Sequence, residues 1–443
     1  MFQAHRERFL ARLAGEQAAA IVPTGALKIR NHDSEYRFRP RSDFYYLTGF
    51  REPDAVLVLV PHHDGAKSVL FLNEKDREAE TWTGRRLGVA DAPHTLGIEQ
   101  AYPLSELWTR LAELLPGHER IVYGFGEDAA FDQRLVARVA ELQQKSRAPR
   151  AAPRAWAEPA LSLHELRLRK DEAELERMRA AARVSAEAHR AVMRAARPGV
   201  NEGELDALLE YTFRRRGGTG SAYGNIVAGG ANACILHYRE NDRALVAGEL
   251  CLVDAGCEWD FYASDVTRTF PIGGRFTREQ RALYELVLRA QAAALACIRP
   301  GATQDEVHDA ATGELVDGLL ALGLLSGTRA EALEKHTYRR FYMHRTGHWL
   351  GLDVHDCGLY TLAGAARPFE PGMVTTVEPG LYVPSDEEGV EPRWRGIGIR
   401  IEDDVLVTES GHEVLTLDVP KAPEELESLC GARNMAASGT GRT

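Results

Sequence analysis

The chain repeats one of its own patterns, and this repeat restricts the possible fold more than any other feature. Residues 188–205, AHRAVMRAARPGVNEGEL, match residues 290–307, AQAAALACIRPGATQDEV, so a helix, the breaker Arg-Pro-Gly and an acid-bearing second helix recur in the same register. Further along each half, a glycine-led strand carries an acid at the matching position, Asp254 in AGELCLVDAG and Glu378 in PGMVTTVEPG. Shared alanine content would explain the helices but not the strands. We therefore expect a duplicated half whose pseudo-twofold axis brings the two acids face to face.

The length of 443 residues suggests two domains, each able to bury its own core. In the first part, AVLVLVP and SVLFLNE are short apolar runs of strand type, and LSELWTRLAELL has helical spacing. We predict an α/β (α+β) fold with a small α/β domain over residues 1–160 and a duplicated domain over 161–430. The segment 143–159, QQKSRAPRAAPRAWAEP, is the candidate linker, and residues 431–443 are expected to be a disordered tail.

Composition and charge exclude several classes of function. A net charge of -11 argues against a nucleic-acid surface, which draws on clustered Lys and Arg. The charged amino terminus MFQAHRERFLARLAGEQ has no apolar core of signal-peptide length, and no run is long enough to span a membrane. The cysteines form no C-x-x-C pair, which predicts reduced thiols in a cytoplasmic protein; they are Cys234, Cys251, Cys257, Cys297, Cys357 and Cys430.

Four acids interrupt runs that are rich in strand-forming residues. They are Asp254 in ELCLVDAG, Asp265 in WDFYASDVTRTFPI, Glu378 in TTVEPG and Glu402 in GIGIRIEDD. A half-buried carboxylate without a partner is strongly unfavourable, so these side chains need cations. Because side chains alternate along a strand, Arg400 and Glu402 would lie on one face.

Each residue also has a plainer explanation. Asp254 could end a strand at a turn, and Asp265 could cap the segment that follows it. Glu402 could lie on a solvated edge with Arg400 as its surface partner. Any one of these explanations is acceptable alone, but together they do not account for four acids in strand contexts.

Four carboxylates and a histidine-rich segment, His344–Asp356 (HRTGHWLGLDVHD), indicate a site for two divalent cations. Bridging carboxylates hold such ions about 3.5 to 4 Å apart. A single zinc ion would need fewer acids and more nitrogen or sulfur ligands. Oxygen ligands favour a harder ion, so we expect two Mn²⁺ per subunit, with Co²⁺, Fe²⁺ or Zn²⁺ as alternatives.

At this point a family resemblance becomes specific. The ordered motifs CILHY, LVDAGCEWDFYASDVTRTFP, HWLGLDVHD, EPGMVTTVEPGLYV and RGIGIRIEDD resemble those of the pita-bread metallopeptidases, and most closely those of the aminopeptidase P group. DFYYLTGFREPDAVLVL and TWTGRRLG in the first part resemble the amino-terminal domain of the bacterial members, so the resemblance covers nearly the whole chain. It implies hydrolysis of the amino-terminal Xaa-Pro bond in peptides with proline at the second position.

The resemblance also assigns the metal ligands. It makes Asp254 and Asp265 ligands of one ion, with Asp265 and Glu402 bridging to the other ion, whose shell His348 and Glu378 complete. The residues themselves indicate the four carboxylates; the choice of histidine comes only from the family. In the implied reaction, a hydroxide shared by the ions attacks the scissile carbonyl, and Glu378 relays the proton to the leaving nitrogen.

Substrate contacts follow from the same motifs. His237 and His355 resemble histidines that contact the substrate carbonyl and the proline side, and His344 would line the proline pocket or steady the intermediate. Tyr223 in SAYGNIV matches a tyrosine near the metals, and Arg400 an arginine that orients a metal carboxylate. For Tyr223 and His237, an ordinary core pair remains an alternative.

The resemblance extends to assembly. Trp82 in TWTGRRLG resembles a tryptophan that reaches the active site of a neighbouring subunit, so a dimer or tetramer is expected, with the amino-terminal domain serving oligomerisation and substrate restriction. Arg147 falls near an arginine used similarly, in a part of the linker that aligns poorly.

Three other functions compete with this hypothesis. A prolidase shares the metal ligands but cleaves Xaa-Pro dipeptides. A creatinase-like hydrolase uses the same fold without metal and departs at the ligands, none of which is missing here. A catalytically inactive binding module is disfavoured by the complete ligand set and the acidic charge.

Overall fold

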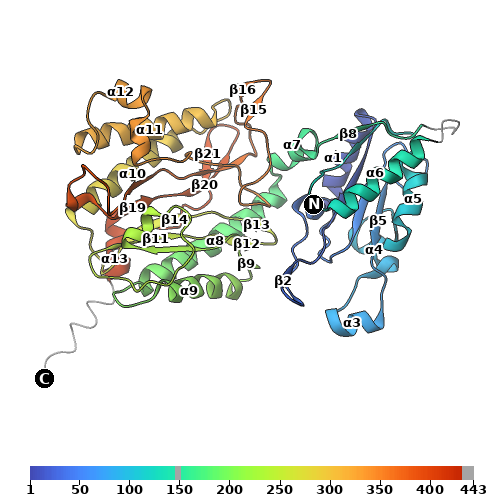
Figure 1. The fold of residues 1–443 in the computed structure, drawn as a ribbon, viewed down its shortest axis with the longest axis horizontal. Coiled ribbons are helices and arrows are strands. Elements are labelled where there is room, and N and C mark those ends of the chain that lie inside the picture. Colours follow the sequence, from blue (N-terminus) through green and yellow to red (C-terminus); the bar gives the residue numbers. More distant parts are fainter. Residues whose placement is uncertain (145–150, 432–443) are drawn as a thin grey trace. The chain divides into compact units, whose positions relative to one another are not determined.

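The computed structural model describes residues 1–144 and 151–431. The chain divides into two compact units, Met1–Arg167 and Leu168–Thr443 (Figure 1). The sequence places the boundary earlier, at residue 160. Arg147 and residues 432–443 of the expected tail lie outside the described residues. Among the described residues, no helix combines the length and apolar character that crossing a membrane requires.

The first unit is built on a six-stranded sheet in the order β6-β5-β4-β1-β7-β8. β4 is antiparallel to β1 and β5, whereas β5 and β6, β1 and β7, and β7 and β8 pair in parallel. β8 lies within the segment that the sequence predicts to be a linker. The strands of this sheet are β1 (Ala18–Pro23), β4 (Val56–Leu59), β5 (Ser68–Leu72), β6 (Gln100–Pro103), β7 (Arg120–Val122) and β8 (Ala155–Ala157). β2 (Ile29–Asn31) and β3 (Ser34–Glu35) form a separate two-stranded sheet.

Helices of this unit cover the sheet with apolar faces. Leu107, Leu111 and Leu114 recur at helical spacing in α5 and enter one core with Ile21 and Val58 of the sheet. The helices are α1 (Phe2–Gly15), α2 (Ser42–Thr48), α3 (Arg77–Thr83), α4 (Gly88–Leu96), α5 (Leu107–Leu114), α6 (Ala129–Gln143) and α7 (Leu163–Leu168).

The second unit contains several small antiparallel sheets. The three-stranded sheets are β10-β11-β14, β13-β12-β9 and β17-β20-β21, and β18 pairs with β19 and β15 with β16. The strands are β9 (Gly220–Ser221), β10 (Ile226–Gly229), β11 (Leu250–Asp254), β12 (Cys257–Trp259), β13 (Tyr262–Ala263), β14 (Thr267–Pro271), β15 (Thr361–Leu362), β16 (Ala365–Ala366), β17 (Val374–Val377), β18 (Gly380–Val383), β19 (Ile397–Arg400), β20 (Asp403–Val407) and β21 (His412–Val414).

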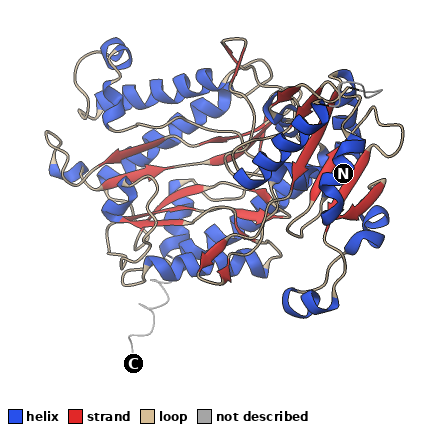
Figure 2. Ribbon diagram, turned by 45° about the vertical axis from the view of Figure 1, so that its right-hand side comes forward, coloured by secondary structure: helices blue, strands red, loops and turns tan. Residues whose placement is uncertain are grey.

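The repeat in the sequence corresponds to two helix pairs. α8 is followed by α9, and α10 by α11, and each second helix begins with a capping box, Asn201 with Glu204 and Thr303 with Glu306. Apart from β15 and β16, which lie at the edge of the unit beside α11, the strands lie between α8 and α9 on one side and α10 to α12 on the other (Figures 1 and 2). The helices are α8 (Glu172–Ala195), α9 (Glu202–Arg215), α10 (Arg278–Cys297), α11 (Gln304–Ala321), α12 (Arg329–Glu334) and α13 (Pro423–Gly431).

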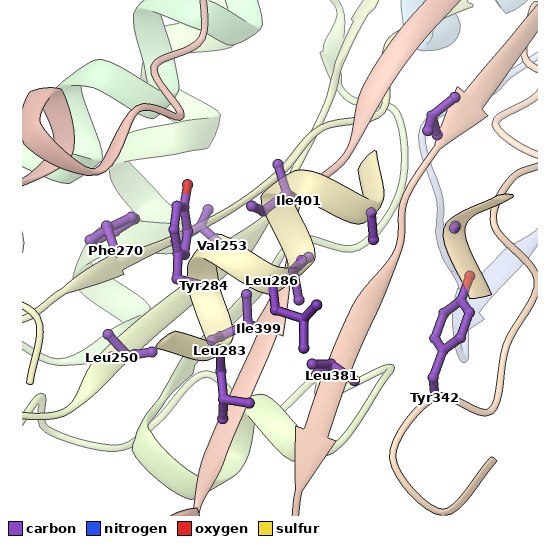
Figure 3. Packing of buried hydrophobic residues seen from close by; sticks show 14 of the residues in the cluster. Leu250, Val253, Phe270, Leu283, Tyr284, Leu286, Tyr342, Leu381, Ile399 and Ile401 are labelled. Carbon is purple, nitrogen blue, oxygen red and sulfur yellow. The ribbon is translucent and has the colours of Figure 1, made fainter. Parts of the chain in front are cut away.

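One large apolar core joins these layers. Figure 3 shows Leu283, Tyr284 and Leu286 of α10 near strand residues that include Ile399 and Leu381, all within one buried cluster. Strands and helices from both halves of the repeat contribute to this cluster, so the two halves fold around one interior. The ends of β11, β17 and β19 are thereby fixed relative to one another.

Candidate active site

A cavity of about 1010 Å³ opens in the second unit at the ends of β11, β17 and β19. Its lining contains all the site residues that the sequence predicts in this unit: Tyr223, His237, Asp254, Asp265, His344, His348, His355, Glu378, Arg400 and Glu402. Trp82 belongs to α3 of the first unit and is 84% exposed. The plainer explanation of Tyr223 and His237 as a core pair fails because His237 is exposed to the cavity.

Strand ends bring the four acids together. Asp254 is the last residue of β11, and its neighbour across the sheet is Thr267, the first residue of β14 and two residues after Asp265. Glu378 directly follows β17, and Glu402 directly precedes β20, with Val377 paired to Asp403. The repeated strands therefore place acids from both halves in one cavity.

Tyr223 joins the two aspartates. Its Oη lies 2.6 Å from Asp254 Oδ1 and 2.5 Å from Asp265 Oδ1, so its single proton is shared between two carboxylates. Burial, followed by the charges of Asp254 and Asp265, raises the pKa of Tyr223 well above its usual range. The hydroxyl thus stays protonated and holds the two carboxylates close together.

Arg400 is the cation that the protein itself provides at this site. Its Nη2 donates to Asp254 Oδ2 at 2.6 Å, and its Nε donates to Thr267 Oγ1 at 3.1 Å. The Thr267 hydroxyl in turn donates to Glu402 Oε2 at 2.6 Å. Arg400 is buried, so it is not the surface partner of the plainer explanation.

The three histidines of the segment His344–Asp356 have different environments. His348 Nδ1 lies 3.0 Å from the carbonyl oxygen of Trp349, and its Nε2 lies 3.3 Å from Asp265 Oδ2 and 3.7 Å from Glu378 Oε1. Burial opposes protonation of His348, but Asp265 and Glu378 outweigh it and raise its pKa to about 9. The ring of His355 meets that of His348 edge-on, with centroids 4.4 Å apart.

His344 ends a directional chain of hydrogen bonds. Burial, followed by the charge of Arg400, lowers its pKa to about 3, so it is neutral and its 3.8 Å approach to Glu378 is not an ion pair. Its Nδ1 lies 2.7 Å from the carbonyl oxygen of Arg345, which can only accept, so Nδ1 carries the proton. Its Nε2 therefore accepts from Tyr382 Oη at 2.9 Å, and Tyr382 accepts from Arg400 Nη1 at 2.9 Å.

Sequence reasoning missed Tyr382 and Thr267. Tyr382 lies on β18, whose Gly380 pairs with Arg400 of β19. Strand alternation puts residues 380 and 382 on one face, so the pairing of EPGLYV with GIGIRI could have identified it. Thr267 gives no comparable signal, since threonine is common in strands.

The donor set fits divalent cations. Four buried or half-buried carboxylates converge here, and among the described residues Arg400 and His348 are the cationic side chains that contact them, whereas Arg239 and Arg345 line the exposed part of the cavity. Burial, followed by the neighbouring carboxylates, raises the pKa of Glu402 well above its usual range. Burial also raises the pKa of Glu378 to about 7, although His348 and Arg400 oppose the shift. Asp265, His348 and Glu402 have potential ligand atoms within 4.8 Å of one another, so added positive charge is what this cavity needs.

Comparison with known proteins agrees with this geometry. Residues 176–409 match the family described as "Metallopeptidase family M24", and residues 2–123 match the family described as "Aminopeptidase P, N-terminal domain". The chain is 43% identical over 429 residues to the Xaa-Pro aminopeptidase of Escherichia coli (strain K12), covering 97% of each chain. The chain belongs to metallopeptidase family M24. As an M24 protein it has the predicted mixed α/β fold, with a small amino-terminal domain and a pita-bread domain, which is confirmed.

Solved structures give the same result for this M24 chain. It is similar to Pseudomonas aeruginosa aminopeptidase PepP, with a TM-score of 0.95, 46% identity and coverage of 98% of both chains. It is also similar to aminopeptidase P from E. coli in a structure with the inhibitor Pro-Leu, with a TM-score of 0.92, 42% identity and coverage of 98% of both chains. Since the M24 family consists of metallopeptidases by its description, this chain is a metal-dependent hydrolase.

Proposed function

We propose that this protein is an Xaa-Pro aminopeptidase that releases the first residue of peptides with proline at the second position. The observation that carries the proposal is the cavity in which four carboxylates, one histidine and a buried arginine converge. The relatives named Xaa-Pro aminopeptidase and the neighbour solved with Pro-Leu support the same substrate class.

The metal ligands would be Asp254, Asp265, His348, Glu378 and Glu402. When bound, two divalent cations would polarise the scissile carbonyl and lower the pKa of the attacking water. Mn²⁺ is the first candidate because carboxylate oxygens dominate the donor set, and Co²⁺, Fe²⁺ or Zn²⁺ are alternatives. His348 suits a ligand role because its Nδ1 is directed at the Trp349 carbonyl, which leaves Nε2 for the cation.

Glu378 is the residue that moves the proton. Its carboxylate lies 3.8 Å from His344 Nδ1 and 3.7 Å from His348 Nε2 in the same cavity, so it is placed to take up a proton and pass it on. The departing group of an Xaa-Pro bond is a secondary amine, which needs that proton to leave. Arg400 positions Asp254, and Tyr223 holds Asp254 against Asp265.

The remaining histidines face the substrate. His237 and His355 are exposed in the cavity, where they can contact the substrate carbonyl and the proline side. His344 uses both ring nitrogens in the chain from Arg400 through Tyr382 to the Arg345 carbonyl. This favours a role as a wall of the proline pocket over a role as a hydrogen-bond donor to the intermediate.

The proposal also covers assembly and location. Trp82 is 84% exposed, so its ring is available to a second copy of the chain, where it would be covered in a homo-oligomer and could complete a neighbouring subunit's site. The six cysteines are free thiols, which suits the cytoplasm. Size-exclusion chromatography with light scattering on the wild type and Trp82→Ala would show whether this side chain maintains the oligomer.

The decisive experiment measures amino acid release after metal removal and Mn²⁺ restoration, using Xaa-Pro-Yaa tripeptides, Xaa-Pro dipeptides and tripeptides without proline. Cleavage of the first class supports the proposal, and a preference for dipeptides would instead identify a prolidase. Glu378→Gln should lower kcat by about a thousandfold or more, because both proton transfer and a metal ligand are affected. Near-wild-type turnover by that variant would remove Glu378 from the mechanism.

A further inference from the structure

The wall of the cavity changes in charge between its floor and its rim. Asp254, Asp265 and Glu402 lie buried at the floor. The exposed lysine, arginine and acidic side chains of the lining are Arg239, Asp305 and Arg345. A peptide that enters with its amino group toward the floor therefore passes guanidinium groups on its way in.

One guanidinium at the rim is not neutralised. Arg345 pairs with Asp305, and both side chains are largely exposed. For Arg239, the described part of the chain provides no side-chain partner for the guanidinium, because the neighbouring Glu240 accepts from the Arg239 backbone N–H and does not line the cavity. The charged rim residues therefore carry one surplus positive charge, located at Arg239, above a floor with surplus negative charge.

We propose that Arg239 binds a carboxylate of the substrate beyond the proline and thereby sets the preference of the enzyme among Xaa-Pro peptides. The inference rests on the proposed function, because that function places the amino group at the floor and directs the rest of the peptide toward the rim. An extended tripeptide spans about 10 Å, so its carboxyl terminus leaves the floor in the direction of the rim. The carboxylate can be the terminus of a tripeptide or an acidic side chain at the third position.

The contact lies away from the bond that is cleaved. Arg239 therefore stabilises the bound substrate and the transition state equally, so the contact lowers KM and leaves kcat nearly unchanged. Because Arg239 is exposed, the effect should weaken as salt is added. Arg239 is thus a specificity-determining residue and not a catalytic one.

The test compares matched peptides on the Mn²⁺-loaded enzyme. Ala-Pro-Ala against its carboxyl-terminal amide isolates the terminal carboxylate, and Ala-Pro-Asp-amide against Ala-Pro-Asn-amide isolates an acidic side chain. We expect the wild type to favour at least one carboxylate-bearing peptide by about tenfold in kcat/KM, the value of one charge-assisted hydrogen bond. Arg239→Ala should bring that ratio close to one through KM alone, and Arg239→Lys should retain part of it.

Arg275→Ala is the matched control, since Arg275 is an exposed arginine of the same unit that does not line the cavity. It should leave every ratio unchanged. Equal cleavage of both members of each pair by the wild type would overturn the inference while leaving the proposed function intact. A ratio that persists in Arg239→Ala would also overturn it, because the carboxylate would then be bound elsewhere. Absence of cleavage of all four peptides would overturn the proposed function itself.

Discussion

Two successive residues, Glu402 and Asp403, show how this protein treats buried negative charge in opposite ways. Glu402 is 2% exposed and Asp403 is 0% exposed, so both are removed from water. Asp403 accepts from Arg268 Nη2 and Lys421 Nζ, each at 2.6 Å, and these cations lower its pKa even though burial acts to raise it. Asp403 is thus a buried acid whose counter-ions belong to the protein.

Glu402 has no such compensation. It accepts from Thr267 Oγ1, and it shares its part of the cavity with the carboxylates of Asp254, Asp265 and Glu378. Burial and those carboxylates raise its pKa well above the usual range. The difference teaches that a structural acid is kept ionised by cations of the protein, whereas the acids of a metal site lack such partners and need an added cation to stabilise their ionised form.

Removal of metal should produce the largest effect. Dialysis against a chelator should reduce peptide hydrolysis to background, and Mn²⁺ should restore it, while the thermal midpoint falls because cations bind the folded cavity. Activity assays and thermal scans on the same samples measure both effects. Full activity in a sample shown to be metal-free by elemental analysis would contradict the claim that Glu402 and its neighbouring acids form a metal site.

The next prediction concerns a pair of isosteric substitutions. In the metal-free protein, Asp403→Asn should lower the free energy of unfolding by about 3–5 kcal/mol, because Arg268 and Lys421 lose their buried partner. Glu402→Gln should leave metal-free stability unchanged or raise it, because it removes a buried carboxyl group whose ionised form is unfavourable there, yet it should weaken Mn²⁺ binding. Urea denaturation and metal titration measure the two effects, and equal destabilisation by both substitutions would contradict the comparison.

Much of this site could be predicted from the sequence. Acids in runs of strand formers are rare enough that Asp254, Asp265, Glu378 and Glu402 stand out together, and the repeated Arg-Pro-Gly segments mark two capped helices. These signals are local, because propensity and alternation act over a few residues. The α/β class and the choice of these four acids followed from them, whereas the pita-bread fold was expected from the family resemblance.

The remaining features depend on residues that are distant in the chain. Arg268 lies 135 positions before Asp403, so no local pattern distinguishes this neutralised acid from Glu402 beside it. The sequence equally allowed the run EDD to be a solvated edge, whereas all three acids are buried. Tyr382 was missed for a similar reason, since its role depends on which strand β18 pairs with.

Two buried histidines extend the comparison and give a prediction for pH. Carboxylates raise the pKa of His348 to about 9, whereas burial, followed by the charge of Arg268, lowers the pKa of His189 to about 4. His189 Nε2 donates to the Ala255 carbonyl at 2.9 Å, and Nδ1 has no hydrogen-bond partner among the described residues. Neutral His189 is therefore the form that fits the folded protein.

In the unfolded state His189 takes up a proton near pH 6.5, whereas in the folded state it takes up that proton only near pH 4. The stabilisation is complete above pH 6.5 and declines as pH falls toward 4. Between pH 7 and pH 5 the wild type should lose about 2 kcal/mol that His189→Gln does not lose, because glutamine cannot take up the proton. Urea denaturation at both pH values gives the difference, and parallel losses in the two proteins would contradict the shift.

The smallest effect is expected where charges are exposed. Arg329 Nε lies 3.0 Å from Asp317 Oδ1, a distance close to that of the Arg268–Asp403 pair, but the two side chains are 56% and 54% exposed. Water already stabilises both charges, so Asp317→Asn should change the free energy of unfolding by less than about 1 kcal/mol, and by less still at high salt. Both substitutions remove an aspartate from an arginine, so the ratio of this change to that of Asp403→Asn compares an exposed pair with a buried acid that also holds Lys421. A loss at Asp317 as large as that at Asp403 would mean that burial does not set the cost of an unpaired arginine in this protein.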